Sequence, residues 1–397
     1  MQSTENNIRK PILCDYKTCT GCSSCANSCA KKAISIELNN EGYYNPVIDY
    51  NKCISCYVCE SRCPIITHQT KHTQKPKAYA AWIKDEHARN HSSSGGIFTA
   101  VATVVLNNGG AVWGAGYSDE MTTIYKCVEC TENLNEIRGS KYVQCKVGDS
   151  FHQIKKQLSD GRIVLFCGTP CHVAGLYAFL NGKLIDNLIT IDFICHGVPS
   201  PKLFENYLKW LAQKYDDDVI DFNFRESRFG QNYNVGTSAT FKNKGKKWLY
   251  LSDNSYTLGF CRDLTVHKAC YLCAFNGTQR LSDFTIGDYH CEKKEFNTYQ
   301  QFLGISCLIL NSEKANKLLP EMDVNYQEVS LEKIIDSNPN YTRHKVCTST
   351  LNLEEICSLP FNDVQKKYFV PSLKDTIKVL LLRTLGGRIA YVLKNIK

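Results

Sequence analysis

The sequence has no segment suited to entering or crossing a membrane. Its N-terminus, Met1 to Lys10, is polar and lacks the apolar centre of a secretion signal. No apolar run approaches the roughly 18 residues that a membrane-spanning helix needs. Both absences argue against secretion, so we expect a cytoplasmic protein whose thiols stay reduced.

Several signatures of enzymes and binding proteins are also missing. The chain has no G-x-G-x-x-G, the fingerprint of a standard dinucleotide fold. It has no C-x-x-x-C-x-x-C run, which disfavours a radical S-adenosylmethionine enzyme. The formal net charge of +8 is spread along the chain without a basic stripe, so we predict no nucleic-acid partner. A basic surface could instead attract an acidic electron-carrier protein or an anionic cofactor.

What the sequence does have is cysteine, 22 in 397 residues. Eight of them form two runs of the spacing C-x-x-C-x-x-C-x-x-x-C, which is the spacing of bacterial two-cluster ferredoxins. In such runs the fourth cysteine ligates the other cluster. The predicted ligands of the first [4Fe-4S] cluster are Cys19, Cys22, Cys25 and Cys63, and those of the second are Cys53, Cys56, Cys59 and Cys29.

A disulfide framework, a zinc site and chance all fit these two runs less well than clusters do. A disulfide framework usually belongs to a short secreted chain, and a zinc site pairs two C-x-x-C units across a longer gap. Two tandem matches are also too many for chance at this cysteine content. Cys14 lies outside both runs, and we expect it to be a spare thiol.

Apolar patterning divides the chain into four regions. Residues 1–70 form a small ferredoxin-like dicluster module, residues 77–158 and 161–330 form the main body, and residues 331–397 are a C-terminal extension. From 161 onward, strand and helix patterns alternate, which indicates a parallel α/β unit, and 218–251 reads as antiparallel strands. The predicted fold class is therefore a multidomain α+β and α/β protein with a mixed sheet.

The predicted elements of the main body follow from apolar runs bounded by turn residues. We predict strands over 78–83, 111–117, 122–127, 162–166, 188–194, 283–289 and 302–310, and helices over 97–106, 170–180 and 201–214. Serines precede the helix at 97–106, in the run Ser93-Ser94-Gly95-Gly96. Such an entry offers free backbone N–H groups and outlines a phosphate site, although an ordinary serine N-cap is the alternative.

Four further cysteines could form another metal site. In parallel α/β sheets, ligands bind beyond the carboxyl ends of the strands. Cys171 and Cys195 both follow predicted strands, and Cys270 and Cys273 form a later C-x-x-C. Together they could hold a third cluster, with a zinc ion or unligated thiols as the alternatives.

The end of the chain has the pattern of a basic amphipathic helix, from about Ser372 to Lys397. Such a helix could lie on an anionic membrane surface as a peripheral contact. We favour the alternative, in which it packs on its own domain or on a partner.

Five ordered motifs resemble one known family. They are Ser93–Gly96, Gly139–Gln144, Phe166–Cys171, Cys195–Ser200 and Gly287–Asp288. Over roughly residues 77–330 the chain resembles the beta-subunit family of coenzyme F420 hydrogenase and dehydrogenase, and a ferredoxin-like module precedes this part, as in several members.

The resemblance implies a flavoprotein that holds FAD beside an extra [4Fe-4S] cluster on Cys171, Cys195, Cys270 and Cys273. The flavin contacts that it implies are Ser93, Ser94, Gly95, Gly96, Lys141, Gly168, Thr169 and Pro170. His172 departs from the family, in which many members have Gln. No catalytic proton donor is assigned, although His196 is a candidate.

The function that the resemblance implies is an oxidoreductase. Single electrons would pass through the clusters to FAD, for hydride transfer to or from a deazaflavin or another small-molecule substrate. The electron donor would be a carrier protein or reduced deazaflavin, and bacterial members are often linked to cell-surface polysaccharide synthesis. The alternative is an electron-relay subunit of a larger complex with no substrate chemistry of its own.

Overall fold

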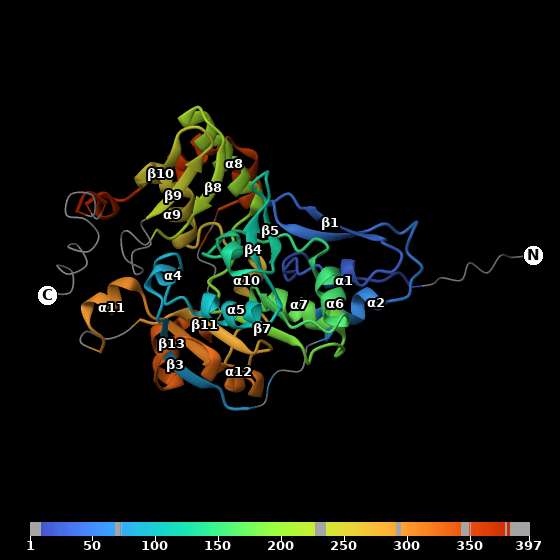
Figure 1. The fold of residues 1–397 in the computed structure, drawn as a ribbon. Coiled ribbons are helices and arrows are strands. Elements are labelled where there is room, and N and C mark those ends of the chain that lie inside the picture. The colour runs from blue at the N-terminus through green and yellow to red at the C-terminus, as the bar shows by residue number, and fades with distance from the viewer. Residues whose placement is uncertain are drawn as a thin grey trace, which may run out of the picture.

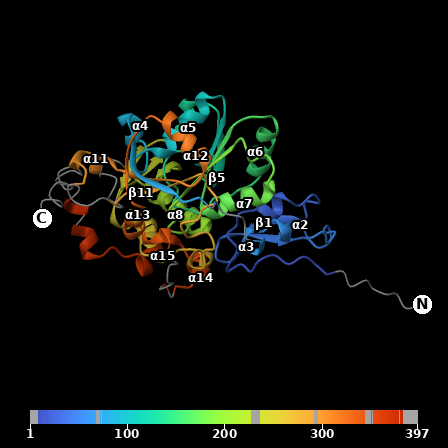
Figure 2. The same cartoon turned by 90° about the horizontal axis from the view of Figure 1, so that it is seen from below.

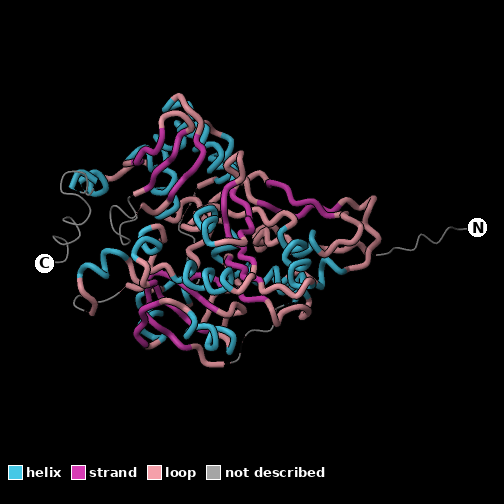
Figure 3. The backbone as a smooth tube through the Cα atoms, in the orientation of Figure 1, coloured by secondary structure: helices cyan, strands magenta, loops and turns pink. Residues whose placement is uncertain are grey.

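The structure is a computed structural model that describes residues 9–67, 72, 74–226, 236–290, 295–342, 349, 351–377 and 379–381. Its strands form sheets of two, three and eight strands. A central body surrounds the largest sheet, a small N-terminal module projects from one side, and a second unit with the three-stranded sheet lies above the body (Figures 1 and 3). None of the described helices is both long and apolar enough to span a bilayer.

The N-terminal module carries the two cysteine runs on short elements. It contains α1 (Ser24–Asn27), β1 (Ile34–Leu38), β2 (Tyr44–Ile48), α2 (Val58–Ser61) and α3 (Pro64–Thr67). The strands β1 and β2 pair antiparallel, with Ile34 opposite Ile48. Seen from below, the module lies along the edge of the body beside α7 (Pro170–Leu180) (Figure 2).

The central sheet is mixed, as the sequence predicts. Its strand order is β13-β3-β12-β11-β7-β6-β4-β5. The neighbours β4, β6, β7 and β11 run parallel, whereas the pairs at both ends are antiparallel. The bounds are β3 (Lys77–Ile83), β4 (Ala111–Tyr117), β5 (Thr123–Val128), β6 (Val164–Cys167), β7 (Leu188–Phe193), β11 (Phe284–Asp288), β12 (Ser306–Leu310) and β13 (Val324–Glu328).

Helices cover both faces of this sheet. Along β6, Leu165 packs into the core under α5 (Ile97–Asn107), whereas Val164 and Phe166 pack into the core under α6 (Ser150–Ser159) and α7. This alternation follows from the period of two along a strand. Because β6 is buried on both faces, it reads in the sequence as a continuous apolar run.

The second unit has an aromatic core of its own. It contains α8 (Pro201–Tyr215), β8 (Val219–Asn223), β9 (Thr237–Phe241), β10 (Gly245–Leu249), α9 (Ser255–Cys261), α14 (Leu353–Ser358) and α15 (Phe361–Tyr368). Phe204, Tyr207, Phe222 and Tyr256 pack together there. The remaining elements are α4 (Glu86–Asn90), η1 (Thr131–Glu136), η3 (Leu251–Asn254), α10 (Lys268–Tyr271), α11 (Thr298–Leu303), α12 (Glu313–Leu318), η4 (Leu319–Glu321), α13 (Leu331–Ser337) and η5 (Pro339–Tyr341).

The structure differs from the predictions at α5, β12 and β13. The predicted strand over 302–310 is shorter, because α11 includes residues 302 and 303 and β12 begins at Ser306. The N-cap of α5 is Gly96, whose φ is 83°, and no side chain caps this helix, so the predicted serine cap is wrong. The strand β13 was not predicted and joins an edge of the central sheet. Of the predicted tail helix, residues 373–377 and 379–381 are helical, and 382–397 lie outside the described residues.

Candidate functional site

A large cavity lies at the carboxyl ends of the parallel strands. It has a volume of about 460 Å³. The last residues of β6, β7 and β11, which are Cys167, Phe193 and Asp288, all line it. This is the edge of a parallel sheet at which ligands bind.

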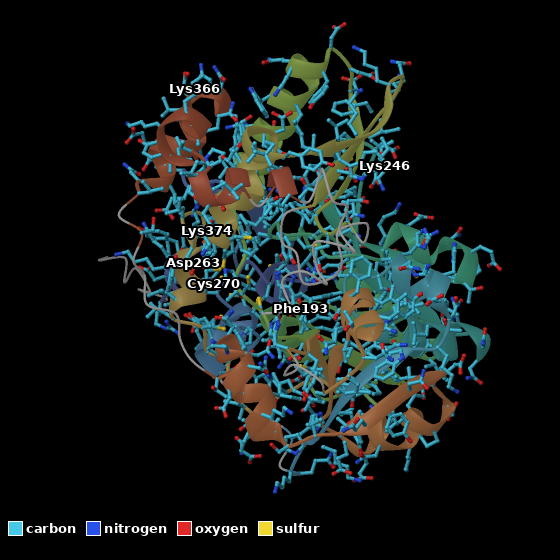
Figure 4. All side chains as sticks on the ribbon, turned by 90° about the vertical axis from the view of Figure 1, so that its left-hand side faces the viewer. Phe193, Lys246, Asp263, Cys270, Lys366 and Lys374 are labelled. Atoms are coloured by element: carbon cyan, nitrogen blue, oxygen red, sulfur yellow. The ribbon has the colours of Figure 1, made fainter. Side chains whose placement is uncertain are left out.

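A second, smaller cavity of about 40 Å³ adjoins the first. All four cysteines of the predicted third cluster line it, namely Cys171, Cys195, Cys270 and Cys273. Cys171 and Cys195 also line the large cavity, so the two cavities share a wall. Residues more than 100 positions apart in the sequence thus gather their thiols at one place, where Cys270 is labelled in Figure 4.

Local backbone features place these four thiols. Cys171 is the second residue of α7, after Pro170, and Cys195 lies two residues beyond β7. Gly197, in the loop after β7, has a φ of 118°. A Cβ there would lie 2.6 Å from Val266 and 3.3 Å from the Cβ of Cys270 in α10. Only glycine allows this close approach.

The electrostatics of the four thiols favour a cationic occupant. Burial raises the pKa of Cys171 well above its usual value, and the charges of Cys195, Cys273 and Cys270 raise it further. Thiolates crowded in this way need compensating positive charge, which iron would supply. Within the described residues, no three His, Cys, Asp or Glu side chains converge on a single ion. A cubane instead takes one thiolate on each of its irons, so its ligands stand further apart.

Most of the predicted flavin contacts lie together. Ser93, Ser94, Gly96, Lys141, Gly168 and Thr169 line the large cavity. Pro170 lines the small cavity instead. Gly95 does not line either one, because it is buried behind the wall and donates its N–H to Ser306 Oγ at 2.8 Å.

Two helices begin at the large cavity. The N-cap residues are Gly96 for α5 and Thr169 for α7, and neither makes a side-chain cap hydrogen bond. The free N–H groups and the positive dipole ends of both 11-residue helices therefore favour an anionic group there. At Gly168, a Cβ would lie 2.6 Å from Tyr125 Oη, so the chain can take this path only without a side chain.

Lys141 adds a cation to the same cavity. Its ammonium donates to the carbonyl of Arg138 and lies 5.8 Å from the ring centroid of Tyr117. Burial lowers the pKa of Lys141 to about 8. Arg225 also lines the cavity but pairs with Asp288 at 2.7 Å.

Two histidines at the cavity differ in setting. His172 is 2% exposed and lies 2.9 Å from Tyr125 Oη through its Nδ1. Burial lowers the pKa of His172 to about 4, so it is neutral at physiological pH. His196 is half-exposed, lies on the wall between the cavities and pairs with Asp263 at 2.8 Å.

The N-terminal module docks against the body beside these cavities. A Cβ on Gly175 of α7 would lie 2.8 Å from the Cβ of Cys22, so helix and cysteine loop are in direct contact. Gln144 accepts a hydrogen bond from Tyr44 N at 2.8 Å and donates to Thr20 O at 3.1 Å. Sequence reasoning missed both contacts, because they join regions far apart in the chain.

Cys14 is not remote from the predicted ligands. Its Sγ lies 3.8 Å from Sγ of Cys63, which belongs to the predicted first cluster. Hydrogen bonding with Cys19 is the largest cause that raises the pKa of Cys14 to about 12. Cys14 therefore lies beside predicted ligands of the first cluster, and its role as a spare thiol stays a prediction.

Family models match most of the chain. The description "Coenzyme F420 hydrogenase/dehydrogenase, beta subunit N-term" matches residues 78–151, and the corresponding C-terminal description matches 161–336. The chain belongs to this beta-subunit family. A third model, the 4Fe-4S dicluster domain, matches residues 18–65. The chain is thus an iron–sulfur electron-transfer protein of the F420 hydrogenase/dehydrogenase type.

Similarity to individual proteins is more distant. No curated protein matches the sequence. Among solved structures, the chain is similar to one from the F420-reducing [NiFe] hydrogenase complex of Methanosarcina barkeri, at 14% identity and a TM-score of 0.44. The match covers 76% of this chain and 92% of that one.

Proposed function

We propose that this family member is an iron–sulfur flavoprotein oxidoreductase. Single electrons enter at the two N-terminal clusters, pass a third cluster and reach FAD, which exchanges hydride with a deazaflavin or another small-molecule substrate. One observation carries the proposal. The loop of Cys22 touches α7, and the first turn of α7 carries Cys171, which lines both the small and the large cavity.

The residues fit the cofactors. Four thiols line the small cavity, and the large cavity lies within the range of about 300–1,000 Å³ that is usual for small-molecule sites. FAD is an anion through its pyrophosphate, and the cavity offers two helix N-termini and Lys141 to bind it. When bound, a flavin supplies the conversion between one-electron and hydride chemistry.

The chain's own groups would hold and insulate these cofactors. Gly168 and Gly197 let the backbone approach where a side chain would collide. Neutral His172 and Tyr125 close the wall beside Gly168 without adding charge. His196 is a candidate for handling a proton, because it lines both cavities and Asp263 orients its ring.

The proposal includes further parts that rest on sequence reasoning. The four-part domain division and the cytoplasmic location rest on the pattern of apolar residues, whereas reduced deazaflavin or a carrier protein as donor and a link to cell-surface polysaccharide synthesis rest on the resemblance. The rival function is an electron-relay subunit with no flavin and no substrate chemistry.

Cys273→Ala tests the order of the cofactors. Anaerobically purified variant should retain FAD and the N-terminal clusters, yet its flavin should no longer be reduced when those clusters are reduced. Hydride exchange between the flavin and a reduced deazaflavin should persist. Cys127→Ala is the matched control, because Cys127 is a half-buried cysteine outside all three predicted sets. Flavin reduction unchanged in Cys273→Ala would contradict the path, and wild-type protein without flavin would support the relay.

A further inference from the structure

The N-terminal module has a body end and a distal end. At the body end, the turn between β1 and β2 is anchored by Tyr43, which donates to Thr265 O at 2.8 Å, and by Ser200, which donates to Gly42 O at 3.0 Å. At the distal end, Asp49 N donates to Ala33 O at 2.8 Å. Figure 1 shows that this end of the ribbon faces away from the body.

The distal end carries the loop of the second predicted cluster. Its ligand Cys29 lies shortly before β1, and its ligand Cys53 lies shortly after β2. Its ligand Cys56 is exposed. Apolar side chains around Cys56 are exposed too, with Ile54 at 62% and Val58 at 36%. A cluster ligand at the surface among apolar side chains suits close approach by a partner rather than contact with water alone.

Basic side chains surround this loop. Lys52 precedes Cys53, Lys31 and Lys32 follow Cys29, and the ammonium of Lys10 lies 4.8 Å from the ring centroid of Tyr50. We call Lys10, Lys31, Lys32, Lys52, Ile54, Cys56 and Val58 the distal patch.

The acidic groups near the distal patch are already paired. Asp49 pairs with Lys52 at 3.2 Å, and Glu60 pairs with Arg9 at 2.7 Å. Lys10, Lys31 and Lys32 have no carboxylate within salt-bridge distance among the residues that the structure describes. The patch therefore carries a net positive charge around an apolar, redox-active centre.

We propose that the distal patch is the docking surface for an acidic one-electron carrier protein, which exchanges electrons with the cluster of Cys53, Cys56, Cys59 and Cys29. This rests on the proposed function. In each event the reduced carrier loses one electron and the oxidised cluster gains it, with no bond made or broken. Opposite charges steer the two proteins together, and the small apolar centre allows rapid release, as transient redox contacts require.

The test uses the full holoprotein and reduced flavodoxin as the acidic carrier. Stopped-flow absorbance under anaerobic conditions gives the second-order rate constant for cluster reduction at low and high ionic strength. Wild type is compared with Lys10→Glu/Lys31→Glu. The matched control is Lys366→Glu/Lys367→Glu, which makes the same change in net charge on α15 of the second unit, where Figure 4 labels Lys366. Methyl viologen, a small cationic reductant, reports whether the clusters are intact.

We expect the rate constant for wild type to fall with added salt and that for the distal-patch variant to be roughly tenfold or more below it at low salt. The control variant should stay within about twofold of wild type. Equal rates for the two double variants would overturn the docking proposal, as would a wild-type rate that rises with salt. If the distal-patch variant loses its clusters, the proposal is still tested by whether the wild-type rate constant falls or rises with added salt.

Failure of the docking proposal is distinguishable from failure of the proposed function. In one outcome, methyl viologen reduces the clusters at the normal rate while the rate of reduction by flavodoxin is the same in wild type and the distal-patch variant. In that case the electron relay stands and the assigned docking surface is wrong. If wild type holds no iron at the N-terminal module, both are wrong.

Discussion

Replacing Lys141 by methionine tests whether the large cavity binds an anionic flavin nucleotide. The lysine lies in the cavity wall with one of its N–H donors on the carbonyl of Arg138, which leaves the others for a ligand. Methionine keeps a similar length and apolar stem but removes the charge and the donors. Binding of FAD to flavin-free protein should therefore weaken without loss of the fold.

The magnitude follows from one hydrogen bond to a charged group, which contributes about 1.5–3 kcal/mol, or roughly 10- to 150-fold in Kd. The pKa of Lys141 without flavin is about 8, so the ammonium is charged below that pH. Binding an anion raises this pKa by about one to two units, the equivalent of the same free energy. Wild-type affinity should therefore be constant below pH 8, fall between pH 8 and about 10, and then approach that of the variant.

Fluorescence titration of flavin-free protein with FAD across this pH range measures the effect. Lys126→Met is the control, because Lys126 of β5 pairs with Glu136 of η1 and does not line the cavity. Below pH 8 the control should bind FAD as wild type does. Because the charge of Lys126 helps to lower the pKa of Lys141, the fall in affinity of the control should begin at a slightly higher pH. Equal affinity of Lys141→Met and wild type, or a wild-type affinity that rises above pH 8, would refute the assigned contact.

Four further substitutions probe the module and the core. Gly175→Ala places a methyl group against the first cysteine loop and should lower the free energy of unfolding by about 0–2 kcal/mol. Overpacking costs about 1–3 kcal/mol, and the higher helix propensity of alanine offsets about 1 kcal/mol of it. Gly259→Ala, equally overpacked in α9, should lower the melting temperature similarly without slowing electron transfer from the module. Cys14→Ala removes the thiol that donates toward Cys19, a predicted ligand of the first cluster. The potential of that cluster should therefore fall by about 40 mV in a redox titration, and an unchanged potential would contradict the contact. Arg280→Met leaves the buried carboxylate of Asp192 without its partner and should cost about 3–5 kcal/mol, measured as a large loss of thermal stability.

Sequence reasoning found the parallel core of the sheet because those strands are buried on both faces. Val164–Cys167 is a continuous apolar run, and Leu188–Phe193 is apolar except at Thr190 and Asp192. The rule that ligands bind at the carboxyl ends of parallel strands then placed Cys171 and Cys195 at one edge, where the structure has them.

What the sequence could not show was tertiary contact between distant regions. The burial pattern of β13 is mostly exposed, so its five residues carry no strong strand signal. The contact of Gly175 with Cys22 and the position of Cys14 depend on how the module packs on α7. The serine N-cap failed because the backbone turns into α5 at Gly96 with a positive φ, which glycine adopts without cost.

The measurement that tests the central claim most directly is the content of iron, sulfide and flavin per chain in protein purified without oxygen. Three cubanes and one flavin predict about twelve irons and one FAD in wild type, and about eight irons with FAD in Cys273→Ala. About eight irons without flavin in wild type would contradict the account, because it would remove Cys171, Cys195, Cys270 and Cys273 as cluster ligands and leave a two-cluster relay.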